Sequence, residues 1–235
     1  MKKPIIKLRF DRKLDQDMAW QFYSASEISG TDFWMERAIR YYPELLNIAK
    51  EKNKKLYLED YIINYYNKHE SEIGLLSKEA VKNLNRKQEE FFCQVNKTFK
   101  GYPWPQKKII GNLSIFDFCP RFLEDNEFQV FIYDSQNFQL FTIFHECLHF
   151  IFYDFAKTNF PDGLGKMDTE SGIFWDIAEV FNAVIQNTKD FRLLHGKIDN
   201  IGYPNHADLI KKGAIIWENK RDVRKWTEEM IDLLS

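Results

Sequence analysis

The alternation of apolar and polar positions changes character along the chain, and each pattern predicts a different kind of element. Residues 4–10 partly alternate between apolar and polar side chains, as expected of a strand. Helical spacing occupies most of residues 15–99, with helices expected at 57–66 and 77–99 and an N-cap at Ser77. The first hundred residues therefore predict a mainly helical part.

The second half begins with strand patterns and returns to helical spacing. Segments 108–118 and 127–133 are rich in Ile, Val, Phe and Tyr and lie on either side of a polar stretch, which predicts two strands. Helices are expected at about 137–157, 170–188 and 205–234, the last with a break near Asn219. Since strands and helices do not alternate regularly, the prediction is an α+β fold. We place a domain boundary near residue 100, giving parts 1–100 and 101–235.

Composition limits the classes of partner. The 33 Lys and Arg residues nearly balance the 35 Asp and Glu residues, so the net charge of −2 favours neither nucleic acid nor an anionic membrane as a partner. With 16% aromatic residues the chain is too apolar to be disordered. The N-terminal residues lack the apolar run of a secretory signal, and the three cysteines do not make a disulfide framework. We therefore expect a cytoplasmic protein, and its oligomeric state stays open.

One short motif predicts metal chemistry. His145 and His149 are four residues apart, so on a helix both rings project from one face and can reach one zinc ion. Glu146 lies beside the first histidine, where its carboxylate can act on a water at the metal without binding the metal itself. Cys147 is expected on the opposite, buried side as a small apolar residue. His69 and His195 are expected at the surface.

At these residues the chain resembles the zincin metallopeptidases, whose hallmark is His-Glu-x-x-His on the active-site helix. The resemblance covers roughly residues 105–187 and implies a small twisted sheet, an active-site helix and a second ligand helix. It also implies that residues 128–133 form the edge strand that pairs with an extended peptide substrate. The metzincin subgroup is excluded because Phe152 and Phe155 stand where its pattern needs Gly and His. The remaining pattern is the gluzincin one, in which the third ligand is a carboxylate from the second helix.

Three carboxylates are candidates for that third ligand. Glu170 has the interval closest to the gluzincin pattern, but its surroundings are typical of a loop or a helix start. Glu179 lies in the middle of an apolar helical segment, where a carboxylate is costly to bury unless it is paired or binds metal. Asp176 and Asn182 share its face and could support a ligand ring or carboxylate. We favour Glu179, with Asp176 and Glu170 as alternatives.

The predicted activity is hydrolysis of peptide bonds by a zinc-dependent metallopeptidase. Glu146 would be the general base, and Tyr203 and His206 are candidate donors to the developing oxyanion. The resemblance suggests these donors because thermolysin-like enzymes place such groups on a later segment. Two alternatives stay open: a regulatory or non-catalytic zinc-binding protein on the same scaffold, and a zinc hydrolase acting on a non-peptide amide.

Overall fold

The computed structural model describes residues 3–25, 31–196 and 198–234, and the chain within them forms two compact units. Unit 1 comprises residues 1–5, 84–109 and 140–235, and unit 2 comprises 6–83 and 110–139. Each unit thus combines segments from both sides of residue 100, and the predicted division at that residue does not coincide with the units. Residues 26–30, which belong to the predicted helical region, lie outside the described residues.

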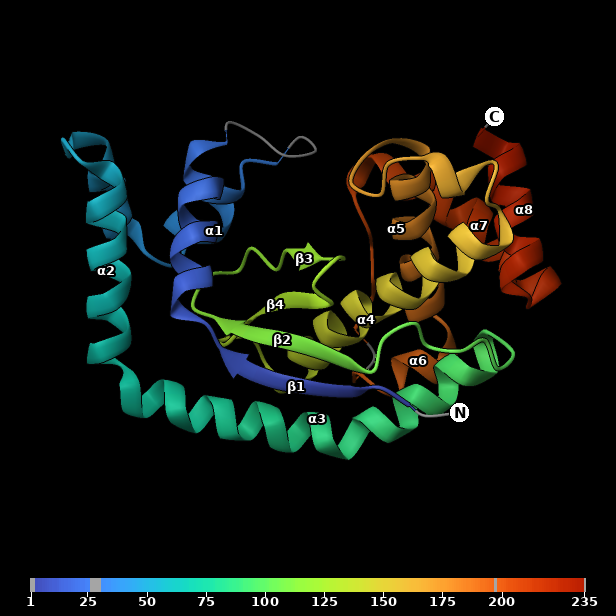
Figure 1. Cartoon of the computed structure of the whole chain (residues 1–235), viewed down its shortest axis with the longest axis horizontal. Helices are drawn as coiled ribbons and strands as arrows, with labels where there is room; N and C mark the ends of the chain where they lie inside the picture. Colours follow the sequence, from blue (N-terminus) through green and yellow to red (C-terminus); the bar gives the residue numbers. More distant parts are fainter. Residues whose placement is uncertain (1–2, 26–30, 197, 235) are drawn as a thin grey trace. The chain divides into compact units, whose positions relative to one another are not determined.

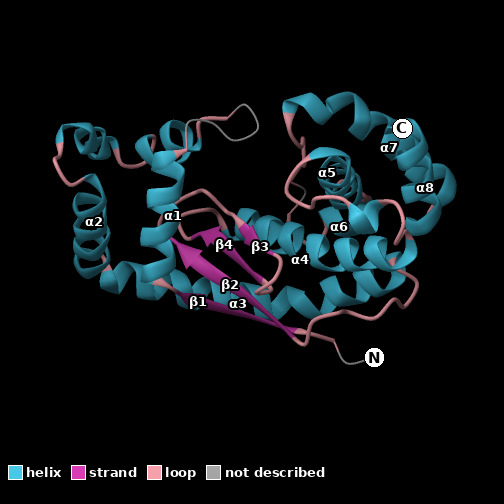
Figure 2. Cartoon of the chain, turned by 45° about the horizontal axis from the view of Figure 1, so that its top comes forward, coloured by secondary structure: helices cyan, strands magenta, loops and turns pink. Residues whose placement is uncertain are grey.

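A four-stranded sheet is built mostly from unit 2 residues (Figure 2). Its strands are β1 (Ile5–Phe10), β2 (Lys108–Ser114), β3 (Arg121–Phe122) and β4 (Glu127–Phe131), in the order β1-β2-β4-β3. β4 is parallel to β2 and antiparallel to the two-residue β3. The prediction that residues 128–133 form an edge strand is wrong in part: β3 lies outside β4 in the strand order, but its register with β4 covers only Glu127 and Phe128.

Unit 2 also contains helices, one of which carries a buried carboxylate. They are α1 (Arg12–Ser24), α2 (Lys54–Lys68) and the first part of α3 (Glu70–Thr98), with a π-helical segment at Trp34–Ile39 and a 3-10 segment at Pro43–Lys50. Asp15 of α1 is 1% exposed and accepts hydrogen bonds from the Tyr66 hydroxyl and the Ile115 amide. The Gln129 side-chain amide donates a third hydrogen bond to it. Asp15 thereby joins α1, α2 and the sheet within this unit.

Unit 1 is helical. It contains the rest of α3 and all of α4 (Gln136–Asn159) except its first four residues. It also contains α5 (Gly172–Gln186), α6 (Lys189–Arg192), α7 (Ala207–Lys220) and α8 (Val223–Leu234). Helices α5, α7 and α8 pack against one another (Figure 1). Gly213 of α7 permits this approach, since a Cβ there would lie 3.2 Å from Val180 and 3.3 Å from Trp226. The left-handed backbone of Arg221 (φ 45°) ends α7 before α8 begins.

Stacked aromatic rings join the two helices that carry the candidate site. Phe152 of α4 and Phe181 of α5 are both fully buried, and their rings stack with centroids 4.4 Å apart. Phe181 also contacts the buried Trp226 of α8, and Phe144 of α4 stacks on Phe91 of α3. Burial of such rings contributes roughly 1.5–3 kcal/mol each. Buried aromatic contacts thus hold α4 against α5, and both against their neighbouring helices.

The α+β prediction is confirmed in its general form, a mainly helical chain with one small sheet. The strand at 4–10 and the helices at 57–66, 137–157 and 170–188 correspond to β1, α2, α4 and α5, and the break near Asn219 falls between α7 and α8. The N-cap at Ser77 is wrong, because α3 already begins at Glu70. In the described part of the chain, no helix is both long and apolar enough to cross a membrane.

Candidate metal centre

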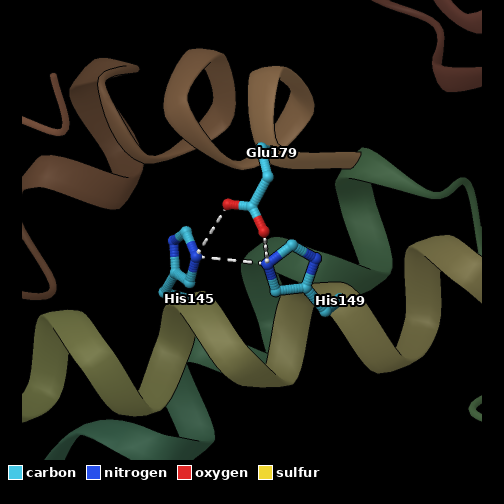
Figure 3. Close-up of side chains that lie close together, drawn as sticks. All are labelled: His145, His149 and Glu179. Atoms are coloured by element: carbon cyan, nitrogen blue, oxygen red, sulfur yellow. Dashed lines mark hydrogen bonds and ion pairs between the residues drawn. The ribbon is translucent and has the colours of Figure 1, made fainter. Parts of the chain in front are cut away.

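Three potential metal ligands converge between α4 and α5, both in unit 1 (Figure 3). His145 and His149 lie one turn apart on α4, and their Nε2 atoms are 3.1 Å apart. Glu179 reaches them from α5, with one carboxylate oxygen 3.5 Å from Nε2 of His145 and the other 3.3 Å from Nε2 of His149. The ligand atoms of the three residues lie within 4.8 Å of one another.

The chemistry of this donor set fits a zinc ion. Two imidazole nitrogens and one carboxylate are the ligands of many catalytic zinc sites. Three groups with lone pairs pointing at one small volume repel each other unless a proton or a cation lies between them. His149 is fully buried and Glu179 is 5% exposed, so bulk water does not screen that repulsion.

The protonation equilibria of the three groups are strongly coupled. Burial would raise the pKa of Glu179, but the charge of His149 and hydrogen bonds from both histidines outweigh it and hold that pKa well below its usual range. Burial would lower the pKa of His145, but Glu179 and the charge of Glu146 raise it above the ordinary value. Positive charge is therefore favoured at the centre of the cluster, whether a proton or a metal ion carries it.

Glu146 and Cys147, which directly follow His145 on α4, are both buried. Glu146 is 6% exposed, and its charge acts on His145. Cys147 is fully buried, and burial raises the pKa of its thiol well above the usual value. Cys147 is therefore a neutral core residue, which confirms the prediction. Of the alternative ligands, neither Asp176 nor Glu170 belongs to the three-residue cluster, which the structure describes as His145, His149 and Glu179.

The side-chain partners of His145 differ from those expected. Its Nδ1 lies 3.0 Å from Oε1 of Gln186, in the last turn of α5. Asn182 instead donates to the main-chain carbonyl of His145, at 2.8 Å. The suggested contact of Asp176 or Asn182 with the ring N–H of a ligand histidine is therefore wrong for His145. Gln186 was missed, although it stands seven residues after Glu179 and so lies on the same face of α5.

Asp176, which lies one turn before Glu179 on α5, pairs with His206. Nε2 of His206 lies 2.7 Å from Oδ1 of Asp176, so it donates its hydrogen to the carboxylate. His206 is 1% exposed, and no described residue offers a hydrogen bond to its Nδ1. The rings of Trp175 and Tyr203 pack against it at 5.2 and 5.7 Å. The two predicted oxyanion donors, Tyr203 and His206, thus lie together beside α5.

Two further polar residues near the cluster were not anticipated. His195 was expected at the surface, but it is fully buried, and its Nε2 lies 3.2 Å from the main-chain carbonyl of Gln186. Asn200 is 7% exposed, and its side-chain amide lies 2.8 Å from Oε1 of Gln186. Both come from the segment after α5, where the sequence carries no periodic pattern that would predict burial.

Comparison with family models, with curated proteins and with solved structures finds no match.

Proposed function

We propose that this protein is a zinc-dependent metallopeptidase of gluzincin type, with His145, His149 and Glu179 as metal ligands. The observation that carries the proposal is the convergence of two Nε2 atoms and a carboxylate within 4.8 Å, together with the buried Glu146 that directly follows His145 on α4. A purely structural zinc site normally has four protein ligands and no need of such a base. Three ligands with an adjacent glutamate are the arrangement used for hydrolysis.

When bound, zinc acts as a Lewis acid that polarises a carbonyl group and lowers the pKa of water. In the proposed reaction Glu146 takes a proton from the attacking water and later gives it to the leaving amine. Glu146 directly follows His145 on α4 and is not one of the three residues of the cluster, as the proposed role of a base requires. The two histidines and Glu179 hold the reacting centre, while Phe152 and Phe181 fix the helices that carry them.

His206 is the preferred donor to the developing oxyanion. The hydrogen bond from its Nε2 to Asp176 fixes the orientation of the ring, and Nδ1 donates to the oxyanion only in the form of the ring that carries a hydrogen on both nitrogens. A buried polar atom without a described partner is costly, and such groups often serve a ligand. We expect His206→Phe to lower kcat about 10- to 1000-fold while zinc content is unchanged. Tyr203 is the second donor to test, by Tyr203→Phe.

The test combines zinc content with peptide hydrolysis. Purified wild type is expected to contain about one equivalent of zinc by elemental analysis and to cleave a mixed peptide library, with products identified by mass spectrometry. His149→Ala is expected to lose both metal and activity. Glu146→Gln is expected to keep the metal and lose hydrolysis. Glu218→Gln, which removes an exposed carboxylate on α7, is the matched control and keeps both.

Each result has a distinct meaning. A wild-type chain free of zinc after purification and after incubation with zinc refutes the proposal. A Glu146→Gln variant that hydrolyses peptides at the wild-type rate refutes the role of that base. Zinc binding without turnover of any peptide would favour the regulatory alternative instead.

A further inference from the structure

Two buried amide side chains form a chain of hydrogen bonds behind the first histidine. Gln186 is fully buried in the last turn of α5, and Asn200 is 7% exposed in the segment that follows. Oε1 of Gln186 lies 3.0 Å from Nδ1 of His145 and 2.8 Å from Nδ2 of Asn200. Neither amide is part of the three-residue cluster, and hydrolysis itself needs neither of them.

Main-chain groups fix the direction of this amide chain at both ends. Nε2 of Gln186 donates to the carbonyl oxygen of Phe141, at 2.9 Å, so the oxygen of that amide must face His145. The main-chain N–H of Gly202 donates to Oδ1 of Asn200, at 2.9 Å, so the NH₂ group of Asn200 must face Gln186. A main-chain carbonyl cannot donate and a main-chain N–H cannot accept, so neither amide can be turned around without losing a hydrogen bond.

This direction determines which nitrogen of His145 carries hydrogen. An oxygen at 3.0 Å from Nδ1 accepts a hydrogen bond, so Nδ1 is protonated. Asn200 Nδ2 and His145 Nδ1, 3.4 Å apart, are then two donors that share the same acceptor oxygen. In the neutral ring the lone pair is left on Nε2, the atom that points at His149 and Glu179.

We propose that Gln186, held in place by Asn200, is a positioning residue that keeps the hydrogen on Nδ1 of His145 and so directs its Nε2 lone pair to the metal. This inference rests on the zinc site proposed above. The inference adds the segment that follows α5 to the proposed site. Hydrogen bonds hold this segment against the end of α5. The side chain of Asn187 pairs with both main-chain polar groups of Asn200, at 2.8 and 2.9 Å. His195 donates to the carbonyl of Gln186 from the same segment.

The test measures zinc affinity by competition with a chromogenic chelator in three full-length variants. Gln186→Met keeps the size of the side chain and removes its acceptor, and is expected to weaken zinc binding about 10- to 100-fold. Gln186→Glu restores an acceptor for Nδ1 and is expected to bind zinc within a few-fold of wild type. Gln94→Met, the same change at a residue of α3 that is not part of the three-residue cluster, is the control and leaves the affinity unchanged.

The glutamate variant separates positioning from simple packing. If Gln186 only filled space, a buried carboxylate facing the Phe141 carbonyl would be worse than methionine, and Gln186→Glu would bind zinc less tightly than Gln186→Met. Replacement of zinc by cobalt gives an independent readout, because the visible absorption bands of the ion report the ligand geometry. We expect these bands to change in Gln186→Met and to return in Gln186→Glu.

The proposal is overturned if Gln186→Met binds zinc within two-fold of wild type or if Gln186→Glu binds less tightly than Gln186→Met. Should circular dichroism show that Gln186→Met does not fold, Asn200→Ala provides the decisive test. We expect it to weaken zinc binding about three- to ten-fold, and an unchanged affinity would contradict the proposal. A wild-type chain that binds no zinc would refute the metal site itself, a result distinguishable from all of these.

Discussion

The buried carboxylate of Asp15 makes the stability of this protein depend on pH in an unusual direction. Burial raises the pKa of Asp15 from 3.8 to about 6, although hydrogen bonds from Tyr66 and other donors work against that rise. Between these two pH values the folded chain holds a proton that the unfolded chain has released. The free energy of unfolding therefore falls as pH rises from about 4 to about 6.

The size of the effect follows from the shift. A rise from 3.8 to about 6 corresponds to roughly 3 kcal/mol, at 1.36 kcal/mol per pH unit. This stabilisation is complete below the unfolded pKa and is lost once pH exceeds the folded pKa. The change that tests it is Asp15→Asn, which cannot ionise. The asparagine oxygen can still accept from Tyr66 and Ile115, and its NH₂ group can donate to Gln129, whose Oε1 is buried without a hydrogen bond among the described residues.

The assay is urea denaturation of wild type and Asp15→Asn at pH 4, 5, 6 and 7, followed by tryptophan fluorescence. We expect similar stabilities at pH 4, and at pH 7 an advantage of about 3 kcal/mol for Asp15→Asn. Asp17→Asn, at an exposed position of the same helix, should differ from wild type by a constant of less than about 0.5 kcal/mol. A constant difference for Asp15→Asn would refute the raised pKa, and a difference of opposite slope would show that the hydrogen bonds outweigh burial.

Three further predictions concern packing and metal. Gly213→Leu should lower the melting temperature by about 5–10 °C in calorimetry, because a side chain there meets Val180 and Trp226. Gly74→Ala, the control, should raise the melting temperature slightly, because a Cβ at Gly74 meets nothing within 4 Å. Phe181→Ala should cost about 3–5 kcal/mol in urea denaturation through loss of its buried contacts, and an effect below 1 kcal/mol would contradict the packing. Removal of metal by a chelator should lower the melting temperature by about 5–10 °C, with full recovery when zinc is added, and an unchanged melting curve would argue against a metal linked to folding.

Local patterns predicted the elements that carry the candidate cluster. Helices α4 and α5 have long runs of apolar residues at helical spacing, so their existence follows from the sequence alone. The four-residue spacing of His145 and His149 likewise follows from the helix. The convergence of Glu179 with them follows less directly, because it depends on the cost of burying a carboxylate in an apolar helix.

Features set by contacts distant in sequence could not be predicted in this way. The resemblance implied an edge strand at residues 128–133, and the two-residue β3 that pairs with the start of β4 has no strand pattern of its own that would have predicted it. Ser77 was expected to begin a helix, but α3 continues through it from Glu70, and a serine within a helix carries no signal that distinguishes it from a cap. Asn200 and His195 belong to a segment without periodicity, and their burial depends on partners at the end of α5.

The polar residues of α5 lie along one stripe of the helix and include both carboxylates and amides. Asp176, Glu179, Asn182 and Gln186 recur at intervals of three and four residues on a helix whose other positions are mostly apolar, so one face of α5 serves the candidate site. The proposed site has two carboxylates, Glu179 as a ligand and Glu146 as the base, which together would match the charge of one divalent ion. A third carboxylate behind His145 would leave excess negative charge in a buried volume and would make a metal bound there a weaker Lewis acid. A glutamine supplies the acceptor that orients the ring and adds no charge, which suits a centre proposed to act on a carbonyl group.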